Sequence, residues 1–284
     1  MQYEYHRATS LEDALAVLGH SDEPVRVIAG GTNVVTELQD AGRAPALLLD
    51  IAGLAELTGI REEDGKITLG ALTSIHELAS SELIRKKAPA LCEAANAFAD
   101  PTTRRHATVG GNLCNASPGA DSAPPLLVCD AEVGLVKGFE ERIVPLEQFI
   151  TGSFRTALQA GELLKWVRFT AKPESAFLKL GHRNAMAISI TTVAVAVETQ
   201  GDGTLQNCRI AYGASGPTPL RAARTEKLLE GKEPCHELLY AAEETLRQDL
   251  SPRDGLRGSL KYRQNVVGTL LRRAVLSAQR AGVG

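Results

Sequence analysis

The chain has 284 residues, a formal net charge of −3 and a sequence pI near 6.1. No block of lysines or arginines stands out, which argues against nucleic acid or an anionic membrane surface as a partner. The first thirty residues lack the pattern of a signal peptide, and no apolar run approaches the ~20 residues that cross a bilayer, so we expect a soluble, cytoplasmic protein without a membrane span. Such a length predicts at least two domains.

The cysteines number five, an odd count, and no two of them form a C-x-x-C pair. Their spacing argues against a disulfide framework, a zinc site or an iron–sulfur cluster within this polypeptide. We expect buried thiols at Cys92, Cys114, Cys129, Cys208 and Cys235.

The N-terminal segment predicts a small α/β unit. Ser10 precedes an apolar face that repeats with helical spacing until Gly19, which indicates a capped helix. The following elements are predicted as a strand over 25–28, a helix over 33–39 and a strand over 47–51.

A second subdomain is predicted to begin at Gly59 with a β-hairpin over 60–69. We expect further helices over 74–79 and 89–98, a helix or strand over 124–128, and strands over 131–136, 142–144 and 163–169.

The polar segment 172–175, with its proline, is the best candidate for a linker. Beyond it, β-branched residues predict strands within 188–198 and 208–212, and periodic patterns predict helices over 221–230, 236–248 and 262–281. Strands followed by helices indicate an α+β unit.

The most informative feature of the chain is a pair of Gly-Gly segments, one within Val27–Asn33 and one within Thr108–Asp121. Each follows a β-branched run and precedes small polar residues, a pattern that lets main-chain N–H groups approach a phosphate closely. Two such turns could hold one pyrophosphate. For the first pair the alternative is a tight strand–helix loop, in which Thr32 and Asn33 only cap the next helix.

The sequence lacks the motifs of several other classes of nucleotide-binding and catalytic site. The chain has no G-x-G-x-x-G after a strand, no G-x-x-x-x-G-K-[ST] and no G-x-S-x-G. His76-Glu77 and His236-Glu237 lack the second histidine of H-E-x-x-H.

Three segments in the same order, Ala29–Asn33, Arg105–Asp121 and Gly258–Arg263, resemble the FAD-binding subunit of the molybdenum hydroxylases. That family includes xanthine dehydrogenase and the medium subunit of aerobic carbon monoxide dehydrogenase. The resemblance implies an α+β protein with a two-subdomain FAD-binding fold of the vanillyl-alcohol oxidase (PCMH) type, followed by a small α+β domain. We expect the FAD-binding domain over 1–173, with subdomains of about 1–58 and 59–173, and the C-terminal domain over 174–284.

The resemblance also implies the cofactor, FAD, with its pyrophosphate at the two glycine segments. Asp121 matches a position at the ribityl or ribose hydroxyls, Lys179 one near the isoalloxazine ring, Leu164 one at its pyrimidine edge and Phe98 one near adenine. The implied FAD-contacting positions are Ile28, Ala29, Gly30, Gly31, Thr32, Asn33, Phe98, Thr108, Gly110, Gly111, Asn112, Asn115, Asp121, Leu164 and Lys179.

Each of these assignments has a simpler alternative. Asp121 could cap a helix before Pro124, Phe98 could belong to the core, and Lys179 could be a solvated lysine on an edge strand. Asn112 and Ser117 carry similar ambiguity. His182 and Arg183 are expected at the surface.

The function implied is an electron relay with no catalytic residue of its own. A molybdopterin-binding large subunit and a small subunit with two [2Fe-2S] clusters would complete a heterotrimer, and NAD, oxygen or a quinone would accept the electrons. The alternatives are a stand-alone flavin oxidoreductase of the same fold and a flavin-free structural subunit.

Three local features refine the comparison with the family. The segment 131–151 has no cysteine-rich insertion, which disfavours the members that carry an extra four-iron cluster. The segment 98–103 replaces the glycine-serine-proline-glutamine sequence that is usual in the family, which could change a loop beside the cofactor. Arg257, Tyr262 and Arg263 combine residue types that are enriched at interfaces, and we expect them to be exposed and available to a partner.

Overall fold

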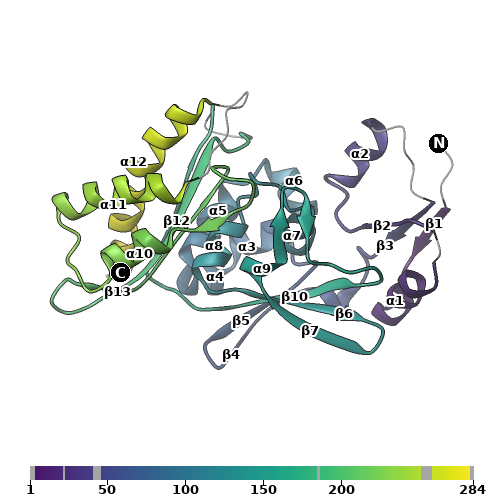
Figure 1. Cartoon of the computed structure of the whole chain (residues 1–284). Coiled ribbons are helices and arrows are strands. Elements are labelled where there is room, and N and C mark those ends of the chain that lie inside the picture. Colours follow the sequence, from purple (N-terminus) through teal and green to yellow (C-terminus); the bar gives the residue numbers. More distant parts are fainter. Residues whose placement is uncertain (1–3, 22, 41–45, 184–185, 251–257, 282–284) are drawn as a thin grey trace.

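The computed structural model describes residues 4–21, 23–40, 46–183, 186–250 and 258–281. Three parts lie in a row in Figure 1: an N-terminal lobe at the right, a central sheet with its helices, and a C-terminal unit at the left. The expected α+β organisation is confirmed, and most expected elements are present with ends shifted by a few residues.

The N-terminal lobe is a three-stranded parallel sheet with two helices. Its elements are β1 (Glu4–Arg7), α1 (Leu11–His20), β2 (Val25–Ile28), α2 (Val34–Asp40) and β3 (Leu47–Asp50), and the strand order is β1-β3-β2. Ser10 caps α1 as expected, because its hydroxyl accepts the N–H of Asp13 at 3.1 Å. A 3₁₀ turn, η1 (Ala55–Leu57), leads into the next part.

The central part is a five-stranded antiparallel sheet in the order β4-β5-β10-β6-β7. Its strands are β4 (Ile60–Glu63), β5 (Lys66–Gly70), β6 (Glu132–Lys137), β7 (Glu140–Pro145) and β10 (Leu163–Thr170), with a small hairpin of β8 (Ile150–Gly152) and β9 (Arg155–Thr156). Its helices are α3 (Ile75–Ser80), α4 (Glu82–Lys87), α5 (Pro89–Asn96), α6 (Pro101–His106), α7 (Val109–Asn115), α8 (Ala123–Val128) and α9 (Leu146–Phe149).

These helices gather above one face of the central sheet in Figure 1. Because side chains alternate along a strand, Val167 and Phe169 join the core beneath the helices, whereas Trp166 and Arg168 occupy the opposite face. There the Trp166 ring lies over Gly134, where a Cβ atom would come within 2.1 Å of the ring, and the Arg168 guanidinium lies 4.7 Å from the ring centroid.

The C-terminal unit is a four-stranded antiparallel sheet in the order β11-β12-β13-β14. Its strands are β11 (Ser175–Leu180), β12 (Thr191–Thr199), β13 (Leu205–Gly213) and β14 (Leu220–Arg221), and its helices are α10 (Ala223–Leu229), α11 (His236–Asp249) and α12 (Leu260–Ala281). The apolar run of β12 is buried on both faces, because α12 packs on one side and α8 on the other.

The central part and the C-terminal unit share one hydrophobic core. The residues Phe177, Ala194, Ala196 and Ala211 of the C-terminal sheet pack into the same cluster as the helices of the central part. The expected linker lies along this junction: Lys172 and Ser175 are buried, and the N–H of Lys172 donates to the carbonyl of Lys87 at 2.7 Å. The domain boundary expected at 173 stays a prediction. The segment around it packs against the central part and does not run freely between two domains.

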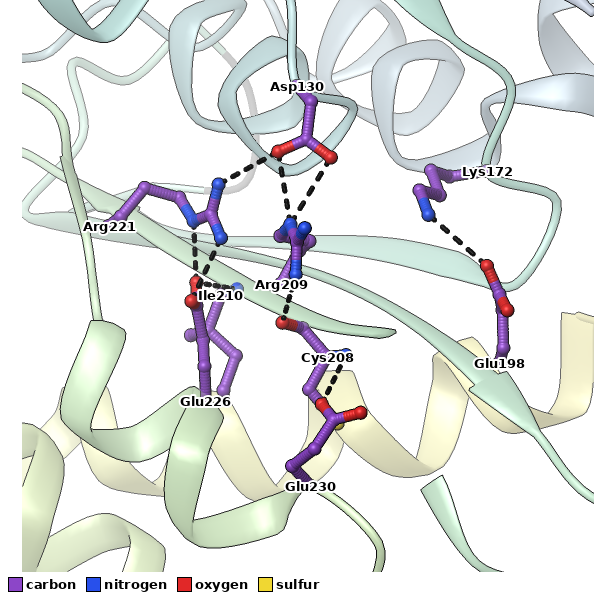
Figure 2. A network of polar contacts seen from close by, with 9 residues as sticks. All are labelled: Asp130, Lys172, Glu198, Cys208, Arg209, Ile210, Arg221, Glu226 and Glu230. Carbon is purple, nitrogen blue, oxygen red and sulfur yellow. Dashed lines mark hydrogen bonds and ion pairs between the residues drawn. The ribbon is translucent and has the colours of Figure 1, made fainter. Parts of the chain in front are cut away.

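A charged network also joins these two parts. Asp130, which follows α8, accepts hydrogen bonds at 3.0 Å from both Arg209 and Arg221 of the C-terminal sheet (Figure 2). Arg221 also pairs with Glu226 through two hydrogen bonds of 2.5 and 2.8 Å, and Glu226 accepts the N–H of Ile210. The network fixes the C-terminal sheet against the end of α8.

No helix within the described parts of the chain has both the length and the apolar character needed to cross a bilayer.

Candidate functional site

A cleft of about 380 Å³ opens between the N-terminal lobe and the central part. Three stretches of chain line most of it: residues 25–34 around the first glycine pair, residues 107–115 around the second, and residues 156–164 before and within β10. Of the expected FAD-contacting residues, the cleft brings together Ala29, Gly30, Gly31, Thr32, Asn33, Phe98, Thr108, Gly110, Gly111, Asn112, Asn115 and Leu164. Ile28, Asp121 and Lys179 are not part of its lining.

The first glycine pair forms the loop between β2 and α2, and its two glycines are required for different reasons. Gly31 has a φ of +71°, which disfavours any residue with a Cβ atom. A Cβ atom on Gly30 would lie 1.6 Å from the carbonyl oxygen of His106, at the end of α6. Gly30 therefore lets the N-terminal lobe approach the central part across the cleft.

This loop carries main-chain donors that other described groups do not use. The amides of residues 30, 31, 32 and 33 make no hydrogen bond to any described residue, and neither do the side chains of Thr32 and Asn33. The helix-capping alternative for these two residues therefore finds no support in the described contacts. Consecutive free N–H groups around a residue of positive φ make a concave site suited to an anion.

The second glycine pair is not a turn, contrary to our expectation. Gly110 and Gly111 lie in the first turn of α7, whose N-cap is Thr108. The amides here are already satisfied: Gly110 donates to the carbonyl of Ala71 at 2.9 Å and Gly111 to the Thr108 hydroxyl at 3.1 Å. Tertiary contacts and the threonine cap outweigh the poor helix propensity of glycine.

The two glycines of this pair also differ in their surroundings. A Cβ atom on Gly110 would meet the Ala71 carbonyl oxygen at 2.7 Å, so Gly110 serves the packing of α7 against the chain after β5. Gly111 is exposed and presents a bare surface to the cleft. The second pair therefore offers close approach more than free amides.

One wall of the cleft contains a buried carboxylate that the sequence analysis did not single out. Glu162 is held by Arg142 through hydrogen bonds of 2.6 and 2.8 Å and accepts the N–H of Gln159 at 2.7 Å. The Arg142 guanidinium lowers the pKa of Glu162. The pair is far apart in sequence and belongs to no motif, so no local signal identifies it.

Cys114 also lines the cleft, and burial raises the pKa of its thiol to about 12. This thiol stays protonated at neutral pH and is a poor nucleophile. It contributes shape rather than chemistry to the wall.

Asp121 and Lys179, both expected at the flavin, lie together outside the cleft lining. The Lys179 ammonium contacts the Asp121 carboxylate at 2.6 Å and also donates to the carbonyl of Ala97, the residue before Phe98 of the cleft lining. The second carboxylate oxygen of Asp121 accepts the Ser189 hydroxyl at 2.6 Å. Lys179 is on the edge strand β11, yet it is an ion-paired residue and not a solvated one.

Burial raises the pKa of Asp121, and the neighbouring Lys179 ammonium opposes that shift. Such a pair is costly to desolvate and costly to break, because the remaining charge would have no partner. The carboxylate caps no helix here, since both its oxygens are used across the junction between the central part and the C-terminal unit.

Of the residues near the C-terminus that we expected to be exposed at an interface, one is exposed and one is buried. Tyr262 is exposed, but Arg263 is buried, since its guanidinium donates to the carbonyls of Ile190 and Ala214. Arg257 lies outside the described residues. His182 and Arg183 are exposed, as expected.

Two sequence families match the chain. The FAD binding domain in molybdopterin dehydrogenase matches residues 1–170, and the CO dehydrogenase flavoprotein C-terminal domain matches residues 176–278. Among curated proteins, the xanthine dehydrogenase FAD-binding subunit of Escherichia coli is 34% identical over 99% of this chain and 97% of its own length. The carbon monoxide dehydrogenase medium chain of Hydrogenophaga pseudoflava is 30% identical over 98% of this chain and 97% of its own.

Solved structures agree with these similarities. Carbon monoxide dehydrogenase from Hydrogenophaga pseudoflava superimposes with a TM-score of 0.94 at 31% identity, covering 99% of this chain and 98% of that one. Quinoline 2-oxidoreductase from Pseudomonas putida gives a TM-score of 0.93 at 26% identity, covering 99% and 98%.

Proposed function

Because the chain belongs to the family of FAD-binding subunits of molybdenum hydroxylases, we propose that it takes electrons from an iron–sulfur partner subunit and passes them to an external acceptor. Its cofactor is FAD. The observation that carries the proposal is the cleft between the two lobes, with its row of unused amides beside a glycine of positive φ. When bound, FAD supplies a group that can accept electrons singly and release them in pairs.

In this proposal the loop of residues 30–33 holds the diphosphate. Its four main-chain N–H groups can neutralise an anion without an arginine, and a buried phosphate oxygen needs such donors. The second segment contributes close approach at Gly111 and side-chain amides at Asn112 and Asn115, which line the same cleft. Thr108 shapes this wall by capping α7.

Leu164 and the neighbouring apolar residues of the cleft suit the flat, largely apolar flavin ring. Lys179 and Asp121 join the central part to the C-terminal unit and do not line the cleft, so their place in the site rests on the resemblance alone. We assign them to the flavin end of the site, where the ammonium would favour the negative charge of a reduced ring.

The partners and acceptor of this proposal follow the family. A molybdopterin-binding large subunit would oxidise the organic substrate, a small subunit with two [2Fe-2S] clusters would deliver the electrons, and NAD, oxygen or a quinone would remove them. The curated relatives are named as subunits or chains of dehydrogenases, which supports an assembly over a stand-alone enzyme.

The test begins with the chain isolated from its native host by a tag. We expect bound flavin, a co-purifying molybdopterin-binding chain and a small iron–sulfur chain, identified by mass spectrometry. The isolated chain, reduced chemically, should be reoxidised by one of the three acceptors and should turn over no organic donor unaided. Turnover of a donor by the chain alone would support a stand-alone oxidoreductase, and a flavin-free complex would support a structural subunit.

A matched pair of variants tests the cleft itself. Gly31→Val places a branched residue at a φ of +71° inside the cleft, and Gly65→Val does so at +74° in the β4–β5 turn, where nothing lies within 4 Å of a Cβ atom. Both cost backbone strain of about 1–3 kcal/mol. We expect only Gly31→Val to lose FAD, measured by flavin content per chain. Equal FAD content in the two variants would contradict the assignment of the diphosphate to this loop.

A further inference from the structure

Ser122 lies at the start of α8, in the position where a serine ordinarily caps its own helix. Such a cap accepts an N–H from the second or third helical residue, and here those residues are Pro124 and Pro125, which have none. Ser122 also has helical backbone angles, φ −79° and ψ −25°, unlike the extended backbone typical of a cap. The hydroxyl makes no capping bond.

The hydroxyl instead points to Asn112, a residue of the cleft wall. Ser122 is buried, with 4% of its surface exposed, and its Oγ donates to Oδ1 of Asn112 at 2.6 Å. Asn112 lines the cleft on α7, and its Nδ2 group has no hydrogen-bond partner among the described residues. An amide whose oxygen is held by a hydroxyl leaves its two N–H donors for another acceptor.

We propose that Ser122 is a positioning residue for FAD: it fixes the Asn112 carboxamide so that the amide nitrogen donates to an oxygen of the cofactor. Because the two prolines offer no main-chain N–H, no capping bond holds the Ser122 side chain over its own helix, and its hydroxyl turns toward Asn112. The inference rests on FAD binding at this cleft but not on the proposed electron transfer.

The test is a double-mutant cycle on the full-length chain, measured as the dissociation constant of FAD by flavin fluorescence after the cofactor has been removed. Ser122→Ala should weaken FAD binding about fivefold, the worth of one typical hydrogen bond. In an Asn112→Ala background the same change should have less than about a twofold effect, because Ser122 then has nothing to position. Equal weakening in both backgrounds, or none in either, would overturn the proposal.

Two further variants separate positioning from stability. Ser81→Ala removes a serine that does cap its helix, α4, and lies outside the cleft lining. In the flavin-free chain it should lower the melting temperature, and it should leave the FAD dissociation constant unchanged, whereas Ser122→Ala should weaken FAD binding whatever its effect on the melting temperature. Asn112→Asp keeps the acceptor for Ser122 and loses the N–H donors, so it should weaken FAD binding; wild-type affinity in this variant would also overturn the proposal.

These measurements distinguish the inference from the proposed function. A chain that binds FAD with the expected cycle but is not reoxidised by any acceptor would contradict only the electron relay. A chain that transfers electrons but shows additive effects in the cycle would contradict only the role of Ser122.

Discussion

Gly30 shows how one missing side chain can set the distance between two lobes. Its loop lies against the carbonyl of His106, so close that a Cβ atom would overlap the oxygen. Because that neighbour is backbone at a helix end, it cannot rotate away as a side chain could. The width of the cleft therefore depends on Gly30 as much as on the residues that face its ligand.

Gly30→Ala should accordingly lower both stability and FAD affinity. Overpacking of this kind costs about 1–3 kcal/mol, which corresponds to a fall of several degrees in melting temperature for a chain of this size. Gly19→Ala is the control, because Gly19 lies in α1 with nothing within 4 Å of a Cβ atom, and helix propensity favours alanine there. A melting temperature for Gly30→Ala equal to that of Gly19→Ala would contradict the close approach.

The cysteines give a second prediction at the residue scale. Burial raises the pKa of three thiols to about 12, those of Cys114, Cys129 and Cys208. At pH 8 only about one such thiol in ten thousand is ionised, so alkylation by iodoacetamide should modify the exposed Cys235 and spare these three. Mass spectrometry after labelling checks this, with labelling in denaturant as the control. Labelling of Cys114 as fast as Cys235 would show that the cleft wall is open.

At the scale of elements, the Arg142–Glu162 pair ties β7 to the loop that leads into β10 along the cleft wall. Arg142 also donates to the carbonyl of Ala157, so one guanidinium holds both ends of that loop. The positions of Leu163 and Leu164, which follow directly, depend on it.

Glu162→Gln should therefore destabilise the chain at neutral pH. Hydrogen bonds to Arg142 lower the pKa of Glu162 in the folded state, so its stabilising effect is fully present above the ordinary value of 4.5 and declines as the pH falls below it. Because the guanidinium is partly exposed, we expect a loss of only about 1 kcal/mol at pH 7. Urea unfolding at pH 7, 5 and 4 measures it; the exposed Glu82→Gln serves as control. A difference that grew toward pH 4 would have the wrong sign.

At the scale of the whole molecule, buried polar contacts and a shared apolar core dock the C-terminal unit onto the central part. Asp121 and Lys179 form the most buried ion pair of this junction, and Asp130 forms a more exposed charged network beside α8 (Figure 2). The two parts should therefore unfold together, since neither keeps its core intact without the other.

Lys179→Met should lower the free energy of unfolding by about 3 kcal/mol, because it leaves a buried carboxylate without its partner. Adding Asp121→Asn should recover most of the loss, since a neutral amide costs less to bury. Denaturant unfolding of the flavin-free chain measures both, and Lys66→Met, which removes an exposed ion pair at 4.0 Å, should change little. If the double variant were less stable than the single one, the pair would not explain the loss.

Local pattern predicted much of this fold. The Ser10 cap, the helical spacing after it and the apolar run of β12 all report on short-range structure, which the sequence displays directly. The glycine pairs pointed to the cleft because positions that need a positive φ, or close approach of one backbone segment to another, favour glycine, which is visible in the sequence.

Other features depend on contacts that have no local signal. Asp121 meets Lys179 across 58 positions of sequence, and Arg263 is buried because distant carbonyls accept its hydrogen bonds. The second glycine pair became a helix start because Thr108 and the carbonyl of Ala71 satisfy its amides. The polar composition of 172–175 suggested an exposed link, but a main-chain bond from Lys172 to Lys87 holds it against the central part, and Lys172 and Ser175 are buried.

The stacked Trp166 has a practical consequence. It is the one tryptophan of the chain, and it lies on the central sheet, on the face away from the helices and the C-terminal unit. Intrinsic fluorescence excited selectively at tryptophan is thus a built-in reporter of a single sheet. Because such an assay reports on that sheet alone, far-UV circular dichroism, to which the helices of every part contribute, should be recorded beside it to check that the C-terminal unit unfolds in the same transition.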